Sequence, residues 1–302
     1  MAAASAISAR SWLLLNLVAM LWGSSFMFFE IGLAGLPPLT LVAVRCLSAF
    51  GFMLLLFGAR RAALAGMWRH RRQLVVLGLA GTALPFSCYA LGQQHVASST
   101  AGTINALMPL FTLLLAILAG QERFAPARLA GVLLGLAGVA VLLGPDGVSD
   151  PAELAGAALC VGATICYGVY AVLLRRYALP LAAGAVATGM VGWGALAATG
   201  LALGVEGLPA EWPDTGPVAA GFALGIGGTA VAYRLFVGLI GSLGATNASL
   251  ATFLIPPYAI AFGALLLGER IDAWFGAGAL VILASLLLVD ERLRRLLRRG
   301  RG

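Results

Sequence analysis

The feature that most constrains this chain is a succession of ten apolar segments, each about as long as a lipid bilayer is thick. A helix needs about 20 apolar residues to cross the hydrocarbon core of a membrane. Short stretches rich in glycine, proline or charge separate the segments. The sequence therefore predicts an all-α integral membrane protein with ten transmembrane helices, at residues 11–32, 38–58, 73–92, 98–119, 127–144, 154–174, 180–204, 217–240, 245–267 and 272–289.

The composition agrees with this fold class. The chain is 61% hydrophobic and 10% charged, whereas soluble domains are about 25% charged. The first segment follows Arg10 and has the form of a signal peptide, but its apolar run continues to about residue 32. We therefore expect an uncleaved first helix.

All nineteen basic residues are arginines, and their distribution predicts the orientation of the chain. With the N-terminus in the cytoplasm, sixteen of them fall in cytoplasmic segments and only Arg270 falls in an outer loop. Positive charge accumulates on the cytoplasmic side of membrane proteins. We predict that both termini are cytoplasmic and that the net charge of +7 reflects this orientation, not nucleic-acid binding. The basic tail, residues 290–302, is expected to bind anionic lipid at the inner face.

The chain also contains an internal repeat. Residues 77–83 (LGLAGTA) match residues 224–230 (LGIGGTA) at an offset of 147. Further pairs match at the same offset or at 145, namely Pro109 with Pro256, Glu122-Arg123 with Glu269-Arg270, and Trp22-Gly23 with Tyr167-Gly168. The sequence thus divides into two five-helix halves, residues 11–144 and 154–289.

An odd number of helices in each half implies that the halves have opposite orientations in the membrane. Inverted repeats are typical of secondary transporters, whose substrate sites lie near the bilayer midplane between the halves. Duplication without a transport function is the alternative.

Several motifs resemble one transporter family. The stretch LWGSSFMFFEIGLAGLPPLTLVAVRCLSA is similar to the opening signature of the EamA family, within the drug/metabolite transporter superfamily. The turns GQERF and LGERI and the segment NALMPLFTLLLA resemble the same family, and the resemblance covers residues 11–289. It implies a ten-helix bacterial inner-membrane protein with cytoplasmic termini that exports small metabolites or amino acids. At Glu30 the family often has a lysine, which puts a shared role for that position in doubt.

Polar and aromatic residues in mid-helix are candidates for a central solute-binding cavity, because polar groups in the hydrocarbon usually face the bundle interior. Trp22 and Ser25 share a helix face, and Tyr167 and Tyr170 are their counterparts in the second half. The candidates are Trp22, Ser25, Tyr89, Thr103, Asn105, Tyr167, Tyr170, Tyr233, Arg234 and Thr252. The alternatives are helix packing for the aromatic, threonine and asparagine side chains, and extension of Arg234 toward the membrane surface.

Four prolines within the apolar segments are candidate hinges, because proline interrupts the helical hydrogen-bond ladder. They are Pro85, Pro109, Pro256 and Pro257.

Glu30 and Arg45 lie on either side of the first turn, GLPP. Two interpretations stay open for Arg45 beside simple extension toward the surface. It either pairs with Glu30 as an outer gate, or faces the cavity near Ser25 and binds a substrate anion. Glu30 is also the one candidate for proton coupling; without it, the protein would be a uniporter.

These observations predict a carrier that exports a neutral or zwitterionic metabolite, preferably an amino acid, by alternating access. The alternatives are a carrier of the drug or nucleotide-sugar type, an intramembrane enzyme and a channel. The sequence has no lysine and so no nucleotide-binding P-loop, and no grouped metal ligands. We therefore expect no catalysis, cofactor or metal, a small-molecule solute and the lipid bilayer as partners, no nucleic acid, and a functional monomer.

Overall fold

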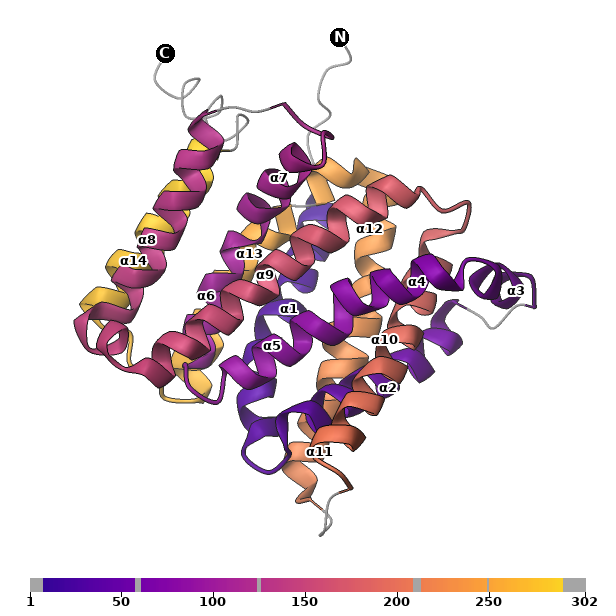
Figure 1. Cartoon of the computed structure of the whole chain (residues 1–302), viewed down its shortest axis with the longest axis horizontal. Helices are drawn as coiled ribbons and strands as arrows, with labels where there is room; N and C mark the ends of the chain where they lie inside the picture. Colours follow the sequence, from indigo (N-terminus) through magenta and orange to yellow (C-terminus); the bar gives the residue numbers. More distant parts are fainter. Residues whose placement is uncertain (1–7, 58–60, 124–125, 209–212, 249, 290–302) are drawn as a thin grey trace.

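The computed structural model describes residues 8–57, 61–123, 126–208, 213–248 and 250–289, and within these ranges the chain folds into helices joined by turns (Figure 1). The predicted lipid-binding tail, residues 290–302, lies outside the described residues.

In the first half of the chain, each predicted segment forms a helix or a continuous helical rod. The elements are α1 (Ala9–Leu33), α2 (Pro38–Phe57), α3 (Arg61–Arg69), α4 (Arg71–Gly78), the π-helix η1 (Leu79–Ala83), α5 (Leu84–Gly92), α6 (Ser98–Ile104), the 3₁₀ turn η2 (Asn105–Leu107), α7 (Met108–Leu118) and α8 (Pro126–Ser149).

The second half repeats this order without counterparts of α3 and of the 3₁₀ turn η2. Its elements are α9 (Pro151–Tyr177), α10 (Ala183–Val205), α11 (Thr215–Gly225), the π-helix η3 (Ile226–Val231), α12 (Ala232–Ala248), α13 (Leu250–Leu266) and α14 (Ala273–Val289).

Among the described residues, eight helical rods are long and apolar enough to cross a membrane. They correspond to the first eight predicted segments. The last two predicted segments form the shorter apolar helices Leu250–Leu266 and Ala273–Leu286. The all-helical membrane architecture is therefore confirmed, with eight of the ten predicted spans at full length.

The third and eighth predicted helices are not purely α-helical, because each contains a π-helical segment. Leu79 and Ile226, where the two π-helices begin, are 147 residues apart and are the third residues of the repeated motif. A threonine hydroxyl in each π-helix donates to a main-chain carbonyl: Thr82 to Gly78 at 2.5 Å and Thr229 to Leu224 at 3.1 Å. Such side-chain bonds to the preceding turn distort helices, and single-turn π segments are frequent at functional sites.

The short helix α3 was not predicted and occupies the loop between α2 and α4. Its Trp68 is exposed, stacks on Trp193 with ring centroids 6.3 Å apart, and lies under the guanidinium group of Arg71. A short basic helix with an exposed tryptophan is typical of the interface between membrane and water.

Close helix packing brings the two halves of the chain together. Helix α1 packs along α13, α2 along α10 and α5 along α9, while α8 and α14 form a separate pair (Figure 1). A side chain at Gly23 of α1 would lie 3.0 Å from the carbonyl oxygen of Ile255, and one at Gly168 of α9 would lie 3.0 Å from the nitrogen of Thr112. These two glycines are matched in the repeat, so the same kind of close contact between the halves occurs twice.

We name the two ends of the bundle by their chain segments. The entry face is the end at which α1 begins and α9 ends. The turn face is the opposite end, at which α1 ends and α2 begins.

Candidate solute-binding cavity

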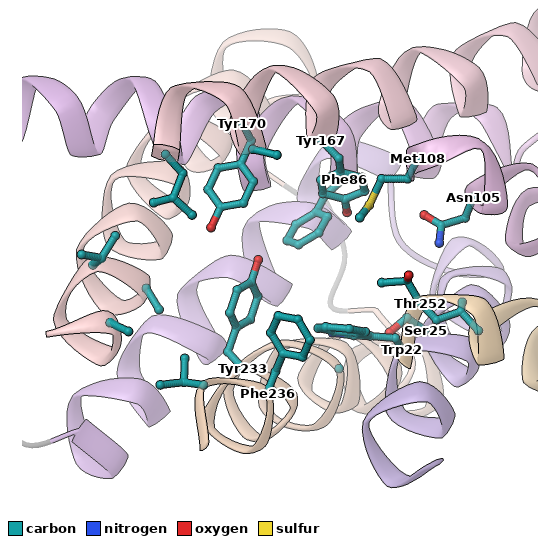
Figure 2. A pocket seen from close by; sticks show the side chains of 18 of the residues that line it. Trp22, Ser25, Phe86, Asn105, Met108, Tyr167, Tyr170, Tyr233, Phe236 and Thr252 are labelled. Carbon is teal, nitrogen blue, oxygen red and sulfur yellow. The ribbon is translucent and has the colours of Figure 1, made fainter. Parts of the chain in front are cut away.

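A cavity of about 490 Å³ lies between the two halves of the chain. Its walls come from both repeats, chiefly from α1, α5, α9, α10, α12 and α13. Figure 2 shows side chains pointing into it from opposite walls. This volume falls in the range of pockets for small molecules, about 300–1,000 Å³.

Eight of the ten residues predicted for a central cavity line this space. They are Trp22, Ser25, Tyr89, Asn105, Tyr167, Tyr170, Tyr233 and Thr252. The repeat therefore identified the cavity-facing side of α1 and of α9 from sequence.

The other two predicted residues, Thr103 and Arg234, are not among the lining residues. Thr103 is buried in α6, where its hydroxyl donates to the carbonyl of Ser99 at 2.7 Å. Arg234 follows the cavity residue Tyr233 on α12, but its side chain is exposed and is not among the lining residues. Thr103 thus agrees with the alternative of helix packing, and the exposed Arg234 agrees with the alternative of extension toward the surface.

Aromatic rings form most of the cavity wall. Trp22 packs against Phe236, with ring centroids 5.0 Å apart, and edge-on against Tyr233 at 6.5 Å. The hydroxyl groups of Tyr170 and Tyr233 point toward each other across the cavity (Figure 2). Nine lining residues are aromatic, so the cavity suits an apolar or aromatic solute.

Sequence reasoning missed several of these rings. Phe26, Phe29, Phe86 and Phe236 line the cavity but were not predicted, and Met108 joins them. Phe26 and Phe29 follow Trp22 at intervals of four and seven residues, which places all three on one helix face. That spacing was the available signal.

A hydrogen bond between Tyr89 and Asn105 forms a small polar site at the deep end of the cavity. The Tyr89 hydroxyl donates to Asn105 Oδ1 at 2.9 Å, and both residues are buried. The Asn105 amide nitrogen donates to no described residue, and Figure 2 shows it on the cavity side. It is therefore available to a bound solute.

Among the described lining residues, Arg45 is the one with a positive charge. Its side chain is 5% exposed and lies among the lining residues. The guanidinium group lies 3.6 Å from the centroid of the Phe86 ring and 5.1 Å from that of Phe29, and its Nε donates to the Thr229 hydroxyl at 3.2 Å. Arg45 thus faces the cavity, as one of the two interpretations from sequence requires.

The alternative ion pair between Arg45 and Glu30 does not form in this conformation. Among the described residues, no carboxylate lies within ion-pairing distance of Arg45. Glu30 is half-buried, and its Oε2 accepts no hydrogen bond from any described residue.

The four predicted hinge prolines do not all interrupt helices. Pro85 is the second residue of α5, just after the π-helix η1, and Pro109 is the second residue of α7, just after the 3₁₀ turn η2, so each lies beside a break in regular α-helix. Pro256 and Pro257 lie inside α13, which continues through them.

The cavity reaches the entry face. Its lining includes Leu174, Ala178, Leu179 and Leu181, where α9 ends and α10 begins. Hydrogen bonds across the halves close the turn face. Glu269 accepts from the Ser98 and Ser99 amides at 2.8 and 3.0 Å, at the start of α6.

A second carboxylate makes a similar contact at the turn face. Glu206, at the end of α10, accepts from the amides of Leu39 and Thr40 at 2.8 and 2.7 Å, and from the Thr40 hydroxyl. The first amides of a helix lack intrahelical partners, so both carboxylates cap a helix of the other half.

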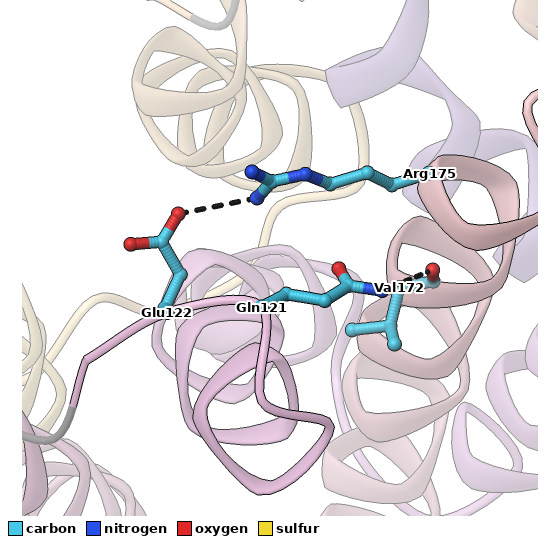
Figure 3. Close-up of polar contacts among 4 residues, drawn as sticks. All are labelled: Gln121, Glu122, Val172 and Arg175. Carbon is cyan, nitrogen blue, oxygen red and sulfur yellow. Dashed lines mark hydrogen bonds and ion pairs between the residues drawn. The ribbon is translucent and has the colours of Figure 1, made fainter.

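Contacts between the end of α7 and α9 lie toward the entry face (Figure 3). Arg175 Nη1 donates to Glu122 Oε1 at 3.1 Å, and Gln121 Nε2 donates to the carbonyl of Val172 at 3.0 Å. Glu122 matches Glu269 in the repeat, so matched acids hold opposite ends of the bundle.

Known proteins with similar sequences are membrane transporters. The chain is 27% identical over 276 residues to the uncharacterized inner membrane transporter YedA of Escherichia coli, covering 90% of this chain and 89% of that protein. It is 28% identical to the aromatic amino acid exporter YddG of Ancylobacter novellus, covering 75% and 78% of the two chains. A protein of Streptantibioticus cattleyicolor named "Probable terminal-alkyne amino-acid exporter" is 28% identical, with 95% of each chain covered.

A solved crystal structure has the same fold. It matches with a TM-score of 0.66 at 22% identity, covering 95% of this chain and 99% of that one.

The family comparison reproduces the division seen in the sequence. The EamA-like transporter family matches the chain twice, over residues 10–144 and 154–289. These matches cover most of the chain, and the apolar helices and the cavity between the repeats agree with them. The chain therefore belongs to the EamA-like transporter family and is a membrane-spanning transporter of small-molecule solutes.

Proposed function

We propose that this transporter exports a small metabolite, preferably an amino acid, by alternating access. The observation that carries the proposal is the aromatic cavity between the two repeats, which reaches the entry face and is closed toward the turn face. Such a cavity is what one of the two end states of an alternating-access carrier requires.

The proposal includes ten transmembrane helices in two inverted five-helix repeats, residues 11–144 and 154–289. The arginine distribution supports cytoplasmic termini and hence a cytoplasmic entry face. The two family matches and the matched π-helices support the repeat. In this arrangement, solute enters from the cytoplasm and leaves when the turn face opens. The protein acts as a monomer in the bacterial inner membrane.

Two relatives support an amino-acid cargo, because their names describe amino-acid exporters. The cavity has room for such a molecule, and its rings suit an apolar or aromatic side chain. A nucleotide sugar fits less well, since its two phosphates require more cations than the single Arg45 among the described lining residues. A carrier of apolar drugs remains the second candidate, favoured by the aromatic walls.

Residue roles follow from this proposal. The lining residues hold the solute, and the breaks beside Pro85 and Pro109 let the ends of their helices move. Glu206 and Glu269 hold the turn face closed.

Flux into proteoliposomes tests the proposed function. The purified chain is reconstituted, and uptake is measured for a panel of labelled amino acids, with empty liposomes as the control. We expect saturable flux of at least one apolar or aromatic amino acid, together with counterflow. Flux of none of them would refute amino-acid export, single-channel currents would indicate a channel, and a chemically altered product would indicate an enzyme.

A further inference from the structure

We propose that Arg45 binds the carboxylate of the solute, and that the cavity selects monoanions with an apolar or aromatic body whether or not they carry an ammonium group. The inference rests on the proposed function, whose cavity it assigns to a substrate class. It goes beyond amino-acid export, because it predicts that acids without an amino group are also ligands.

The guanidinium group of Arg45 is held in place, but only some of its hydrogen-bond donors have a partner among the described residues. Its Nε donates to Thr229, and its plane lies against Phe86. The two Nη atoms donate to no described residue. A guanidinium group has five donors in a fork that matches the two oxygens of a carboxylate. The free side of this fork is therefore available to a ligand in the cavity.

Thr229 makes Arg45 rigid. Thr229 lies in the π-helix η3, and its hydroxyl accepts from Arg45 Nε and donates to the carbonyl of Leu224 in α11. Thr229 itself is fully buried, so this second bond fixes the hydroxyl orientation. A ligand would consequently meet a guanidinium group with little freedom left to lose on binding.

The charge of the cavity is unbalanced. Among the lining residues that the structure describes, Arg45 carries the one formal charge, and no aspartate or glutamate accompanies it. A buried charge without a partner is costly, and a bound anion offsets that cost. A solute with a single carboxylate supplies the missing charge.

An ammonium group would find weaker recognition in this cavity. Asn105 Oδ1 already accepts from Tyr89, so it has one lone pair left, and as a neutral oxygen it binds an ammonium group less strongly than a carboxylate would. Aromatic faces attract ammonium groups, but without a carboxylate this attraction is modest. The carboxylate therefore dominates recognition, and the ammonium group of an amino acid is dispensable.

The second repeat has a methionine, Met190, at the position equivalent to Arg45. Arg45 and Met190 contact repeat-matched glycines, since the main chain of Arg45 packs on Gly225 and that of Met190 packs on Gly78. Met190 is fully buried. A methionine is therefore accommodated at the equivalent position, which makes Arg45→Met the natural test variant.

Binding to the full-length protein in detergent tests the inference in a series of ligands built on one ring. The series is 3-phenylpropanoate with a carboxylate, 3-phenylpropanamide as its neutral analogue, phenylalanine with both charges, and 2-phenylethylamine with only the ammonium group. Affinities are measured by calorimetry. We expect 3-phenylpropanoate to bind at least as tightly as phenylalanine, and both to bind at least about 10-fold more tightly than the amide and the amine, since charge-assisted hydrogen bonds are the stronger ones.

The variants assign the effect to Arg45. In Arg45→Met the preference for the carboxylate over the amide should vanish, whereas Arg45→Lys should retain part of it. Arg234→Met, at an exposed arginine outside the cavity, is the matched control and should keep the full preference. Because the readout is a ratio of two affinities, it holds even where a variant is less stable.

The outcomes separate this inference from the proposed function. Equal binding of the carboxylate and the amide, a preference for 2-phenylethylamine, absence of binding by the carboxylate, or an unchanged preference in Arg45→Met would each overturn the role of Arg45. Flux of amino acids in liposomes combined with any of these results would leave the proposed function standing. Binding of 3-phenylpropanoate through Arg45 without flux of any amino acid would refute amino-acid export alone.

Discussion

At the residue scale, a few positions carry different side chains in the two repeats although their surroundings match. Arg45 and Met190 are one example, and Ser25 and Tyr170 are another. A side chain on Gly228 would meet the Ser25 hydroxyl, and one on Gly81 would meet the Tyr170 ring at 2.7 Å. The matched glycines preserve the packing, so the differing side chains are free to shape the cavity for a solute.

A substitution of Gly23 tests whether the close packing of α1 against α13 requires a residue without a side chain. We expect Gly23→Ala to lower the free energy of unfolding by about 1–3 kcal/mol, because overpacking forces the neighbouring backbone to move. The added carbon would lie 2.6 Å from Tyr258 Cβ and 3.0 Å from the carbonyl oxygen of Ile255. Unfolding is measured in detergent by denaturant titration.

Gly51 provides the matched control. It lies inside α2, and no atom comes within 4 Å of an added carbon. Gly51→Ala should raise stability by about 0.5–1 kcal/mol, since alanine is the better helix former. Equal effects of the two substitutions would contradict the packing argument.

The sequence predicted which residues line the cavity better than it predicted which way a side chain such as that of Arg45 points. The Trp22–Tyr167 match predicted that both residues face a space between the halves, and both line the cavity. For Arg45, spacing along the chain left two directions open, and the contact with Thr229, 184 residues away, selected one. Contacts at that separation are not visible in a single sequence.

At the element scale, the helices themselves follow from apolar length, and their irregular parts do not. The limits of α2 and α6 follow directly from Pro38 and Ser98, which begin apolar runs after turns. The π-helices depend on where one threonine hydroxyl finds a carbonyl, which apolar periodicity does not encode. Helix α3 was not predicted, because the prediction rested on apolar segments long enough to span a membrane and α3 has only nine residues.

Glu269 caps the N-terminus of α6, and a single substitution of Glu269 can weaken this cap without changing the helix itself. We expect Glu269→Gln to lower stability by about 1 kcal/mol, because an ionised carboxylate at a helix N-terminus is replaced by a neutral amide. Amide hydrogen exchange at Ser98 and Ser99 should also accelerate, since Glu269 accepts from both amides.

A different acid serves as the control for this substitution. Asp214 precedes α11, is exposed and makes no side-chain capping bond. Asp214→Asn should therefore change stability by less than about 0.5 kcal/mol. The capping role would be ruled out if exchange at Ser98 stayed unchanged in Glu269→Gln.

At the scale of the whole molecule, the two repeats enclose a cavity that reaches one face. The sequence predicted this division from the repeated motif and the further matched pairs, and the family matches, residues 10–144 and 154–289, have nearly the same boundaries. Which face was open could not be predicted, since it depends on the relative tilt of the halves. That tilt differs between the states of one carrier, while the sequence is the same in all of them.

Labelling of introduced cysteines tests which face meets the cytoplasm. The background has Cys46, Cys88, Cys160 and Cys166 replaced by alanine. In intact cells, an impermeant maleimide should label Ala34→Cys on the exposed turn after α1, and should reach Leu181→Cys at the cavity mouth only after the cells are opened. The reverse pattern would place the entry face outside and make the protein an importer.

The pairing of α8 with α14 sets these two helices apart from the helices that line the cavity. The described residues of these two helices contribute nothing to the cavity lining, yet they join the last helices of both repeats along their length. A change of access must rearrange the helices around the cavity, and nothing in the lining requires this pair to follow. We therefore expect the α8–α14 pair to stay in place. Spectroscopic distances from a label on this pair to a label at Leu181 would then report the opening and closing of a single molecule.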